Sequence, residues 1–453
     1  MPSFVPPKSR CRLLLEGLAL LAILGLALWM RLAFVRTVDV SNLGDPLDYQ
    51  ARGLHFAAHG DFRGSSYRAP GYVAYVGLHY FLFGFRDRPI YLTQALLSTL
   101  LVLFLHLTAR RAFGPGAGLI AAALAAFFGP FVGYAGVLFA EVFYLALVAG
   151  AIWLAVEADA RMARGDHAGP WAWPWAAGSG LLLGVATLTR SIALPLALLI
   201  PAWFLLPFPA AGPGADRSRP ARPFPWRRRL ALGIAALAAF LLVLLPWTGR
   251  NYLVFHRVVP VDTVSGLNLL IGNNPRANGT FTFIDYLDAY QRAVWIPNEA
   301  DRDKVLMSEA LGYIRSHPAL FRDLTKLRWR LFWTQDQDYL EALYHWERIP
   351  LIGSRHVVSV VQTGLLALGL AGLVLAWRHR HALLFAGGAL YVAVAQSIFY
   401  EVPRYRLPAT PFLALLAAFA LTQRPHWWLL LSLPLAGLFY WWLVTSRLAL
   451  GVA

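Results

Sequence analysis

The chain has 453 residues, of which 58% are hydrophobic and only 14% are charged. Because a soluble domain needs a larger share of charged residues, the composition excludes an ordinary soluble protein and indicates a polytopic membrane protein. The formal net charge of +16 does not indicate a nucleic-acid partner, since the arginines gather in short loops between apolar segments, where membrane topology accounts for them. The one cysteine, Cys11, excludes an internal disulfide and a cysteine-based metal cluster.

Apolar segments of about 20 residues predict 11 membrane crossings, because a segment of that length spans a hydrocarbon core of about 30 Å. The first segment, residues 13–35, follows basic residues and lacks a cleavage site, so we expect an uncleaved anchor with a cytoplasmic N-terminus. We expect residues 174–207 to form two short helices that meet at Thr189–Ser191, because Arg190 would otherwise lie in mid-bilayer, where an arginine is costly. The remaining predicted spans are residues 89–109, 117–138, 141–158, 230–248, 357–377, 381–399, 407–422 and 427–445.

Three segments outside these spans have recognisable patterns. Residues 70–83 are apolar but short, which predicts a re-entrant or interfacial helix. Residues 209–229 are rich in proline, glycine and arginine and are predicted to form a cytoplasmic connector without a packed core. Residues 249–355 form the one large external segment, and the expected C-terminus is external.

The external segment is predicted to mix strand and helix. Thr280–Ile284 follows Asn278-Gly279 and has the pattern of one strand of a hairpin. Asn298 is a suitable start for a helix that ends at Ser316. Residues 321–333 repeat apolar positions at three- and four-residue steps, which is typical of a helix on the membrane surface.

The predicted fold class is therefore an all-α polytopic membrane protein with about 11 transmembrane helices, juxtamembrane helices and one external α/β loop region. We expect three parts. Residues 1–248 form an N-terminal transmembrane catalytic module with a first external loop at 36–88, residues 249–355 an external loop region, and residues 356–453 C-terminal transmembrane helices.

Acids follow the first span at the membrane surface, in Gly44-Asp45-Pro46-Leu47-Asp48-Tyr49. A helix beginning at Asp45 places Asp48 and Tyr49 on the same side, so all three side chains can face one cavity. Displacement of a phosphate from a sugar by a hydroxyl group needs a base at the attacking oxygen and cations at the leaving phosphate. Asp45 is our candidate base, although it can also act as a helix cap. Asp48 can instead pair with Arg52 one turn further on.

Arginines supply the candidate cations. Arg68 precedes the short apolar segment and is a candidate for binding the phosphate. Arg190 can contact the same phosphate or anchor a hairpin at the interface. Arg404 and Arg406 can bind phosphate or pair with Glu401 at the surface, and we favour phosphate for Arg404.

At this point several motifs, in this order, resemble those of the GT-C superfamily of membrane glycosyltransferases, in particular the bacterial branch related to protein O-mannosyltransferases and to the lipid A aminoarabinose transferase. Together they extend over residues 39–411. The motifs are Asp45-Pro-Leu-Asp48-Tyr49, Tyr67-Arg68-Ala-Pro70-Gly71-Tyr72, Phe139-Ala-Glu141, Leu188-Thr189-Arg190, Leu245-Pro246-Trp247-Thr-Gly-Arg250-Asn251-Tyr252, Gly266-Leu-Asn268-Leu-Leu-Ile-Gly272-Asn273-Asn274-Pro275 and Pro403-Arg404-Tyr405-Arg406-Leu407-Pro408.

The resemblance implies transfer of a sugar from a polyprenyl-phosphate donor to a lipid, glycan or protein acceptor, with inversion, on the periplasmic face of a bacterial cytoplasmic membrane. It matches Asp45 to the family's catalytic aspartate and Tyr49 to the tyrosine four positions later. It gives Glu141 the role of a second acid that supports the site or helps bind a divalent metal, so Asp45 and Glu141 are the candidate ligands of any metal; no other cofactor is expected. The motifs also supply Tyr72, Asn251, Asn273 and Tyr405 as candidate substrate-binding residues.

Two further expectations concern the lipid and the rival function. The prenyl tail is expected in a groove between residues 70–84 and the spans, with residues 251–355 covering the cavity. A transporter or flippase for a lipid-linked sugar would use the same acids and arginines to bind cargo. Such a protein would carry them near the bilayer midplane, whereas the predicted topology gathers them at one interface.

Overall fold

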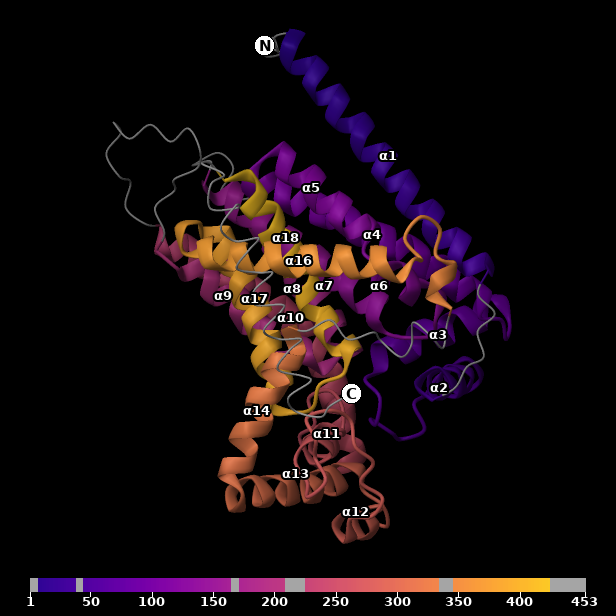
Figure 1. The fold of residues 1–453 in the computed structure, drawn as a ribbon. Coiled ribbons are helices and arrows are strands. Elements are labelled where there is room, and N and C mark those ends of the chain that lie inside the picture. The colour runs from indigo at the N-terminus through magenta and orange to yellow at the C-terminus, as the bar shows by residue number, and fades with distance from the viewer. Residues whose placement is uncertain (1–6, 38–43, 164–170, 208–224, 334–344, 424–453) are drawn as a thin grey trace.

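The computed structural model describes residues 7–37, 44–163, 171–207, 225–333 and 345–423, and within these ranges it contains helices and no strand (Figure 1). The predicted all-α polytopic fold is confirmed. The strand expected at Thr280–Ile284 is wrong, because no second strand lies beside the segment. Instead the Thr282 hydroxyl donates to the Ile271 carbonyl at 2.8 Å, and the Asn278 side chain accepts from the Thr280 amide at 3.0 Å in a local turn.

Helices of crossing length account for most of the bundle. Six are long and apolar enough to span a membrane among the described residues, so the chain is a multi-pass membrane protein. The six are α1 (Pro7–Thr37), α4 (Arg88–Phe113), α7 (Glu141–Ala163), α10 (Trp226–Phe255), α17 (Arg380–Ile398) and η6 with α18 (Pro403–Ala409 and Thr410–Thr422).

Shorter helices occupy three more of the predicted spans. The chain splits at Arg190, as expected, into α8 (Trp173–Thr189), the short turn η3 (Ser191–Ala193) and α9 (Leu196–Leu205). A further helix, α16 (Arg355–Leu375), is followed by the turn η5 (Ala376–Arg378). The total of 11 crossings stays a prediction, and the span at 427–445 and residues 209–224 of the connector lie outside the described residues.

The span predicted at 117–138 is broken. Helix α5 (Pro115–Ala126) meets α6 (Gly129–Gly133) and η1 (Tyr134–Gly136) at a bend of 65°. Arg31 of α1 is fully buried beside the break, and its guanidinium group donates to the carbonyls of Ala125 and Ala126 at 3.4 Å each and to the Ser98 hydroxyl at 2.6 Å. These bonds satisfy carbonyls that the interrupted helix leaves without partners.

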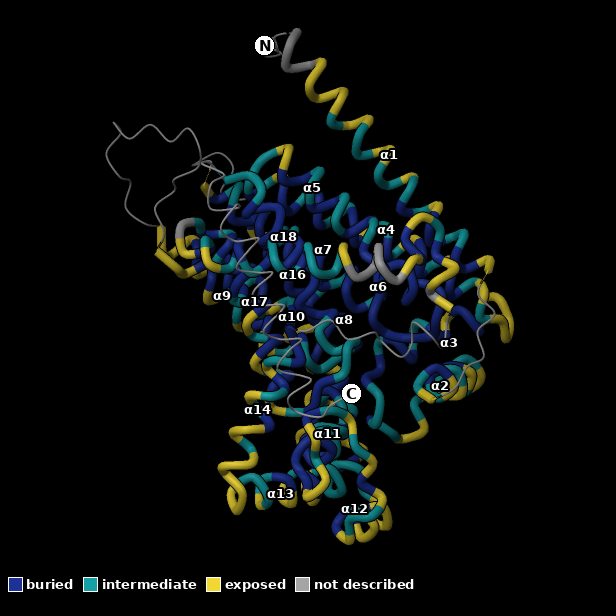
Figure 2. Tube along the Cα trace, in the orientation of Figure 1, coloured by how far each residue is buried: buried dark blue, intermediate teal, exposed yellow. Residues whose placement is uncertain are grey.

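Small residues bring two helices of the bundle into close contact. A Cβ atom on Gly180 of α8 would lie 1.9 Å from the Ala236 carbonyl oxygen of α10, and one on Gly184 would lie 2.7 Å from Val243. This Gly-x-x-x-Gly spacing is typical of membrane helices whose backbones touch. The first half of α1, in contrast, projects from the bundle and exposes its leucines (Figure 2).

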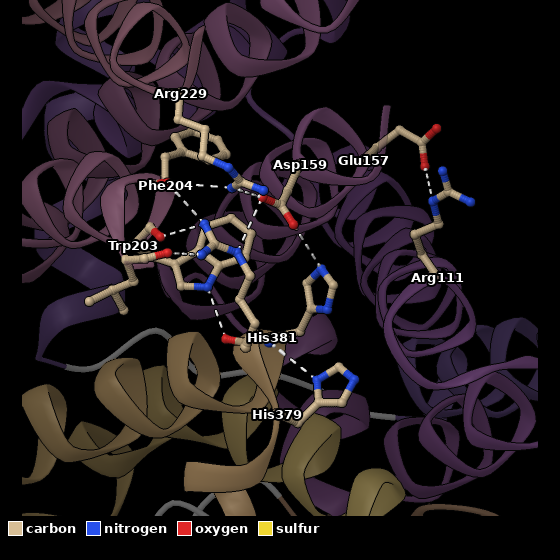
Figure 3. A network of polar contacts seen from close by, with 10 residues as sticks. Arg111, Glu157, Asp159, Trp203, Phe204, Arg229, His379 and His381 are labelled. Carbon is tan, nitrogen blue, oxygen red and sulfur yellow. Dashed lines mark hydrogen bonds and ion pairs between the residues drawn. The ribbon is translucent and has the colours of Figure 1, made fainter. Parts of the chain in front are cut away.

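A buried polar cluster joins α7, α9, α10 and α17 (Figure 3). Asp159 of α7 pairs with Arg229 of α10, with Arg380 of α17 at 3.3 Å and with His381 at 3.4 Å. Arg380 also donates to the carbonyls of Trp203 and Phe204 in α9 at 2.7 and 3.0 Å. Nearby, Glu157 accepts from Arg111 and Arg161 at 2.9 Å each. The predicted basic loops thus meet at one end of the bundle.

Residues 256–333 lie at the other end of the bundle (Figure 1), and we call them the outer region after their expected position. It contains α11 (Ser265–Gly272), α12 (Asp288–Ala293), α13 (Glu299–Ser316) and α14 (Pro318–Trp333). The predicted helix start is confirmed, because the Asn298 side chain accepts from the amides of Ala300 and Asp301.

The outer region is fixed firmly to the bundle. Buried Arg328 of α14 reaches the Gly272 carbonyl at the end of α11 and the Ile398 carbonyl at the end of α17, the latter at 3.0 Å. A Cβ atom on Gly272 would lie 1.7 Å from the Phe399 carbonyl oxygen. The two helix ends therefore touch through backbone atoms.

Candidate functional site

Helix α2 (Asp45–His59) opens with the predicted acids. Gly44 has a φ of 66°, a conformation that suits glycine, and Pro46 favours the first helical turn. The carboxylates of Asp45 and Asp48 lie at the positive end of the helix, where negative charge is stabilising. The predicted placement of both acids in one turn, with Tyr49 beside them, is present in the structure.

A neighbouring short helix supports α2. This helix, α3 (Pro70–Phe83), packs along α2 through Gly53 of α2 and Gly77 of α3. A Cβ atom on Gly53 would lie 2.4 Å from Val76, and one on Gly77 would lie 2.6 Å from Phe56. Such contact needs glycine at both positions. It fixes the loop between the two helices, which carries Arg68.

Asp45 lies between two arginines from distant parts of the chain. Its Oδ1 atom accepts from Arg68 and its Oδ2 atom from Arg404 of η6, both at 2.6 Å. Arg68 also donates to Asp48 at 2.7 Å, and Asp48 accepts from Arg52 at 2.8 Å. The alternative expected for Asp48, an ion pair with Arg52, is therefore present together with its contact to Arg68.

A second acid and arginine lie next to this group. Glu141, the first residue of α7, is 2% exposed and pairs with Arg190, the residue that ends α8. Its Oε1 atom accepts from Arg190, while its Oε2 atom has no hydrogen-bond partner among the described residues. An acid in this position is costly unless a partner or a ligand compensates its charge.

Aromatic rings join the two acid and arginine pairs. The Tyr405 ring lies under both Arg190 and Arg404, at 5.6 and 5.3 Å from ring centre to guanidinium carbon. Arg68 lies 5.0 Å from the centre of the Tyr49 ring. These cation–π contacts help to hold the guanidinium groups in place.

The charges around Asp45 set its protonation. Burial alone would raise the pKa of Asp45, but the positive charges of Arg404 and Arg68 outweigh it and hold that pKa below its usual range. Burial raises the pKa of Tyr49, while the surrounding charges of Arg68, Asp45, Glu141 and Arg190 act on it in both directions. Both ion pairs are thus within electrostatic reach of one tyrosine.

The structure adds Asp262, which the sequence analysis missed. It lies in the loop between α10 and α11 and hydrogen-bonds to Ser191, next to Arg190. Burial raises the pKa of Asp262 to about 6, helped by the negative charge of Asp303 and opposed by Arg68. No local motif marks this aspartate, because only the fold brings its loop to the end of α8.

Two of the predicted substrate-binding residues are buried and hydrogen-bonded inside the protein. Tyr72 is fully buried, donates to Gln94 at 2.6 Å and packs edge-on against Tyr49. Asn251 is fully buried and bonds Ser66 and the Val259 carbonyl. The structure does not bring these two side chains into the ion-pair cluster, where they would meet a ligand directly.

Asn273 and Arg406 also lie apart from the ion pairs. Asn273 is 1% exposed and donates to the Leu269 and Ile398 carbonyls, so it belongs to the junction between α11 and α17. Arg406 lines a pocket beside η6 and donates to the Pro403 carbonyl at 3.2 Å. The pocket is mainly apolar, and its walls come from α6, α14, α16, η6 and α18.

The described acids do not form a ready metal site. No group of three or more His, Cys, Asp or Glu residues that can hold a metal ion occurs in the described ranges. Both oxygens of Asp45 and one oxygen of Glu141 accept from arginine, so a divalent cation at these two carboxylates would have to displace a guanidinium group. The arrangement suits an anion that binds the arginines in place of the carboxylates better than it suits a metal ion.

Residues 68–247 match the family model of dolichyl-phosphate-mannose-protein mannosyltransferases. This match includes Arg68, Glu141 and Arg190. No curated protein matches the chain in sequence.

Solved structures are similar in fold. The archaeal oligosaccharyltransferase AglB from Archaeoglobus fulgidus, in complex with an inhibitory peptide and a dolichol-phosphate, is 15% identical over 89% of this chain and 50% of that chain, with a TM-score of 0.52. The apo form of the Archaeoglobus fulgidus oligosaccharyltransferase is 15% identical over 95% of this chain and 54% of that chain, with a TM-score of 0.53. ArnT from Cupriavidus metallidurans, bound to undecaprenyl phosphate, is 17% identical over 90% of this chain and 77% of that chain, with a TM-score of 0.40.

The chain thus spans about half the length of the oligosaccharyltransferase that it matches. The resemblance expected from the ordered motifs is confirmed, since residues 68–247 match the mannosyltransferase family model and the chain is similar in fold to the AglB oligosaccharyltransferase.

Proposed function

We propose that this protein transfers a sugar from a polyprenyl-phosphate donor to a lipid, glycan or protein acceptor, at the periplasmic face of a bacterial cytoplasmic membrane. The observation that carries the proposal is the carboxylate of Asp45 held between Arg68 and Arg404, with the Glu141–Arg190 pair beside it. Two guanidinium groups at one point match the charge of a phosphate, and the carboxylate between them matches the need for a base. The dolichol-phosphate in the AglB complex supports the same class of carrier.

The donor phosphate would replace Asp45 as the hydrogen-bond acceptor of Arg68 and Arg404. Arg68 donates to the carboxylates of Asp45 and Asp48, and Arg404 donates to Asp45. When the phosphate binds them, Asp45 loses the positive charges that lower its pKa, and its burial then raises that pKa. Donor binding would therefore turn a weak base into a stronger one.

The chemical step is a single displacement with inversion. The acceptor O–H bond breaks and its proton passes to Asp45, while the acceptor oxygen bonds to the anomeric carbon. The bond from that carbon to the phosphate oxygen breaks, and its electron pair leaves with polyprenyl phosphate. Arg68 and Arg404 stabilise the charge that develops on the leaving phosphate.

The prenyl tail has a suitable apolar pocket beside the phosphate position. Pro403 and Arg406, which flank Arg404, both line it, together with leucines of α16 and α18. We therefore propose this pocket for the first isoprene units, in place of the groove beside residues 70–84.

The test is transfer of label from a panel of radiolabelled polyprenyl-phosphate sugars into membrane extract, comparing wild type with Asp45→Asn. Wild type should label an acceptor, and the variant should lose about 10²- to 10⁴-fold in rate, the usual contribution of a general base. Asp301→Asn, in an exposed ion pair with Arg257, is the matched control and should keep full activity. Full activity of Asp45→Asn contradicts the assignment, and donor binding without consumption by wild type favours the transport alternative.

A further inference from the structure

We propose that Glu299, the first residue of α13, is a positioning residue that holds the Arg68 loop in place and so connects the outer region to the phosphate-binding arginine. The proposal rests on the proposed function for the role of Arg68. Nothing in the sequence around Glu299 marks it beyond its place at a helix start, and 231 residues separate it from Arg68.

Glu299 uses both carboxylate oxygens to hold the residues just before Arg68. Its Oε1 atom accepts from the Ser65 hydroxyl at 2.7 Å, and its Oε2 atom accepts from the Ser66 amide at 2.8 Å. The same Oε2 atom accepts from the Thr263 hydroxyl at 3.1 Å. Charge-assisted bonds of this kind are stronger than neutral ones and fix geometry as well as distance.

Further bonds close a ring around Ser66. Its hydroxyl donates to Asn251 at 2.7 Å, and its carbonyl accepts from the Thr263 amide at 3.0 Å. Arg250 donates to the Ser66 hydroxyl at 3.0 Å. The predicted candidate Asn251 is thus part of this ring, which explains why its side chain is buried away from the ion pairs.

This ring of hydrogen bonds is connected directly to the candidate site. Ser65 also accepts from Arg52 at 3.3 Å, and Arg52 binds Asp48. Two residues after Ser66, Arg68 binds Asp45 and Asp48. A shift of the Ser65–Ser66 backbone would therefore move the guanidinium group of Arg68 relative to Asp45.

The test is binding of undecaprenyl phosphate to the purified full chain in detergent micelles. Glu299→Gln should weaken binding about 5- to 30-fold, because an amide cannot accept all three bonds. Ser65→Ala removes the hydroxyl that donates to Glu299 and accepts from Arg52 and the Tyr67 amide, and it should weaken binding about 2- to 5-fold because the Ser66 amide still donates to Glu299. Glu309→Gln, on the exposed side of the same helix, should leave it within about 2-fold.

Two controls separate positioning from general stability. In an Arg68→Ala background, Glu299→Gln should have no further effect on binding, since residues that act through each other are not additive. Hydrogen exchange at the Ser66 amide should speed up in Glu299→Gln, because that amide donates to the carboxylate.

The outcomes are distinct. If wild type binds undecaprenyl phosphate but Glu299→Gln and Ser65→Ala bind it equally well, the inference is overturned and the proposed function stands. Additive effects of Glu299→Gln and Arg68→Ala also overturn it. If wild type does not bind undecaprenyl phosphate at all, the proposed function fails, and unchanged exchange at Ser66 would then overturn the positioning role separately.

Discussion

Asp45 and Arg404 are 359 residues apart in the sequence, yet Oδ2 of Asp45 accepts a hydrogen bond of 2.6 Å from the Arg404 guanidinium group. The first residue of α2 and an arginine that precedes α18 therefore belong to one site. Arg404 also packs on the rings of Phe139 and Tyr405, at 5.0 and 5.3 Å. Its position is fixed before any substrate arrives.

Arg404→Ala should weaken donor binding about 10- to 150-fold, because a hydrogen bond to a charged group is worth about 1.5–3 kcal/mol. The measurement is the KM for the polyprenyl-phosphate sugar, or the Kd of polyprenyl phosphate. Arg257→Ala is the matched control, since Arg257 pairs with Asp301 at the exposed surface of the outer region. An unchanged donor affinity in Arg404→Ala would assign this arginine to structure alone.

Asp262→Asn should change how stability depends on pH. The folded protein holds the pKa of Asp262 at about 6, above the value of about 3.9 in an unfolded chain. The group therefore favours folding most below pH 4, and this contribution is lost as the pH rises through 6. At pH 8 the variant should melt a few degrees above wild type, since 1 kcal/mol shifts Tm by about 2–4 °C.

The difference in Tm between Asp262→Asn and wild type should shrink as the pH falls to about 4.5. Asp61→Asn serves as the control, because hydrogen bonds from the Arg63 amide and from His55 lower the pKa of exposed Asp61. A difference in Tm that is the same at pH 8 and pH 4.5 would contradict the ionisation argument.

Gly272→Ala should disrupt the junction between the outer region and the bundle. The added Cβ atom would lie 1.7 Å from the Phe399 carbonyl oxygen, and backbone atoms cannot move aside as the end of a side chain can. We expect loss of folded protein on expression, or a fall in Tm of more than about 5 °C. The contrasting change is Gly312→Ala on α13, where no atom lies within 4 Å, and it should be neutral or slightly stabilising.

Much of the helical framework could be predicted because membrane spans depend on local composition. The break at Arg190 and the helix start at Asn298 followed from single residues with strong local preferences. The bend between α5 and α6 was not predicted, although Gly129-Pro130 at the break disfavours a continuous helix; the bonds that Arg31 makes to the freed carbonyls come from the tertiary fold. The false strand at Thr280–Ile284 had the right turn chemistry but no neighbour to pair with.

Part of the candidate site could likewise be predicted from local sequence, and part depends on the tertiary fold. Asp45, Asp48 and Tyr49 share one helical turn, so their spacing alone placed them together. The pairing of Glu141 with Arg190 and of Asp45 with Arg404 needs the tertiary fold, although the residues themselves stood out as charges beside apolar runs. Asp262 and Glu299 stand in polar loops or helix starts, where an acid is ordinary. Only their partners distinguish them.

Helix α7 carries an ion pair at each end, with Glu141 bound to Arg190 at one and Asp159 bound to Arg229 at the other. These acids are 18 positions apart, which is about 27 Å along an α-helix and close to the thickness of a hydrocarbon core. The continuous helix therefore fixes the distance between the Glu141–Arg190 pair of the candidate site and the Asp159 cluster at the other end of the bundle. A change of bilayer thickness would have to be met by tilting the helix, because its length cannot change.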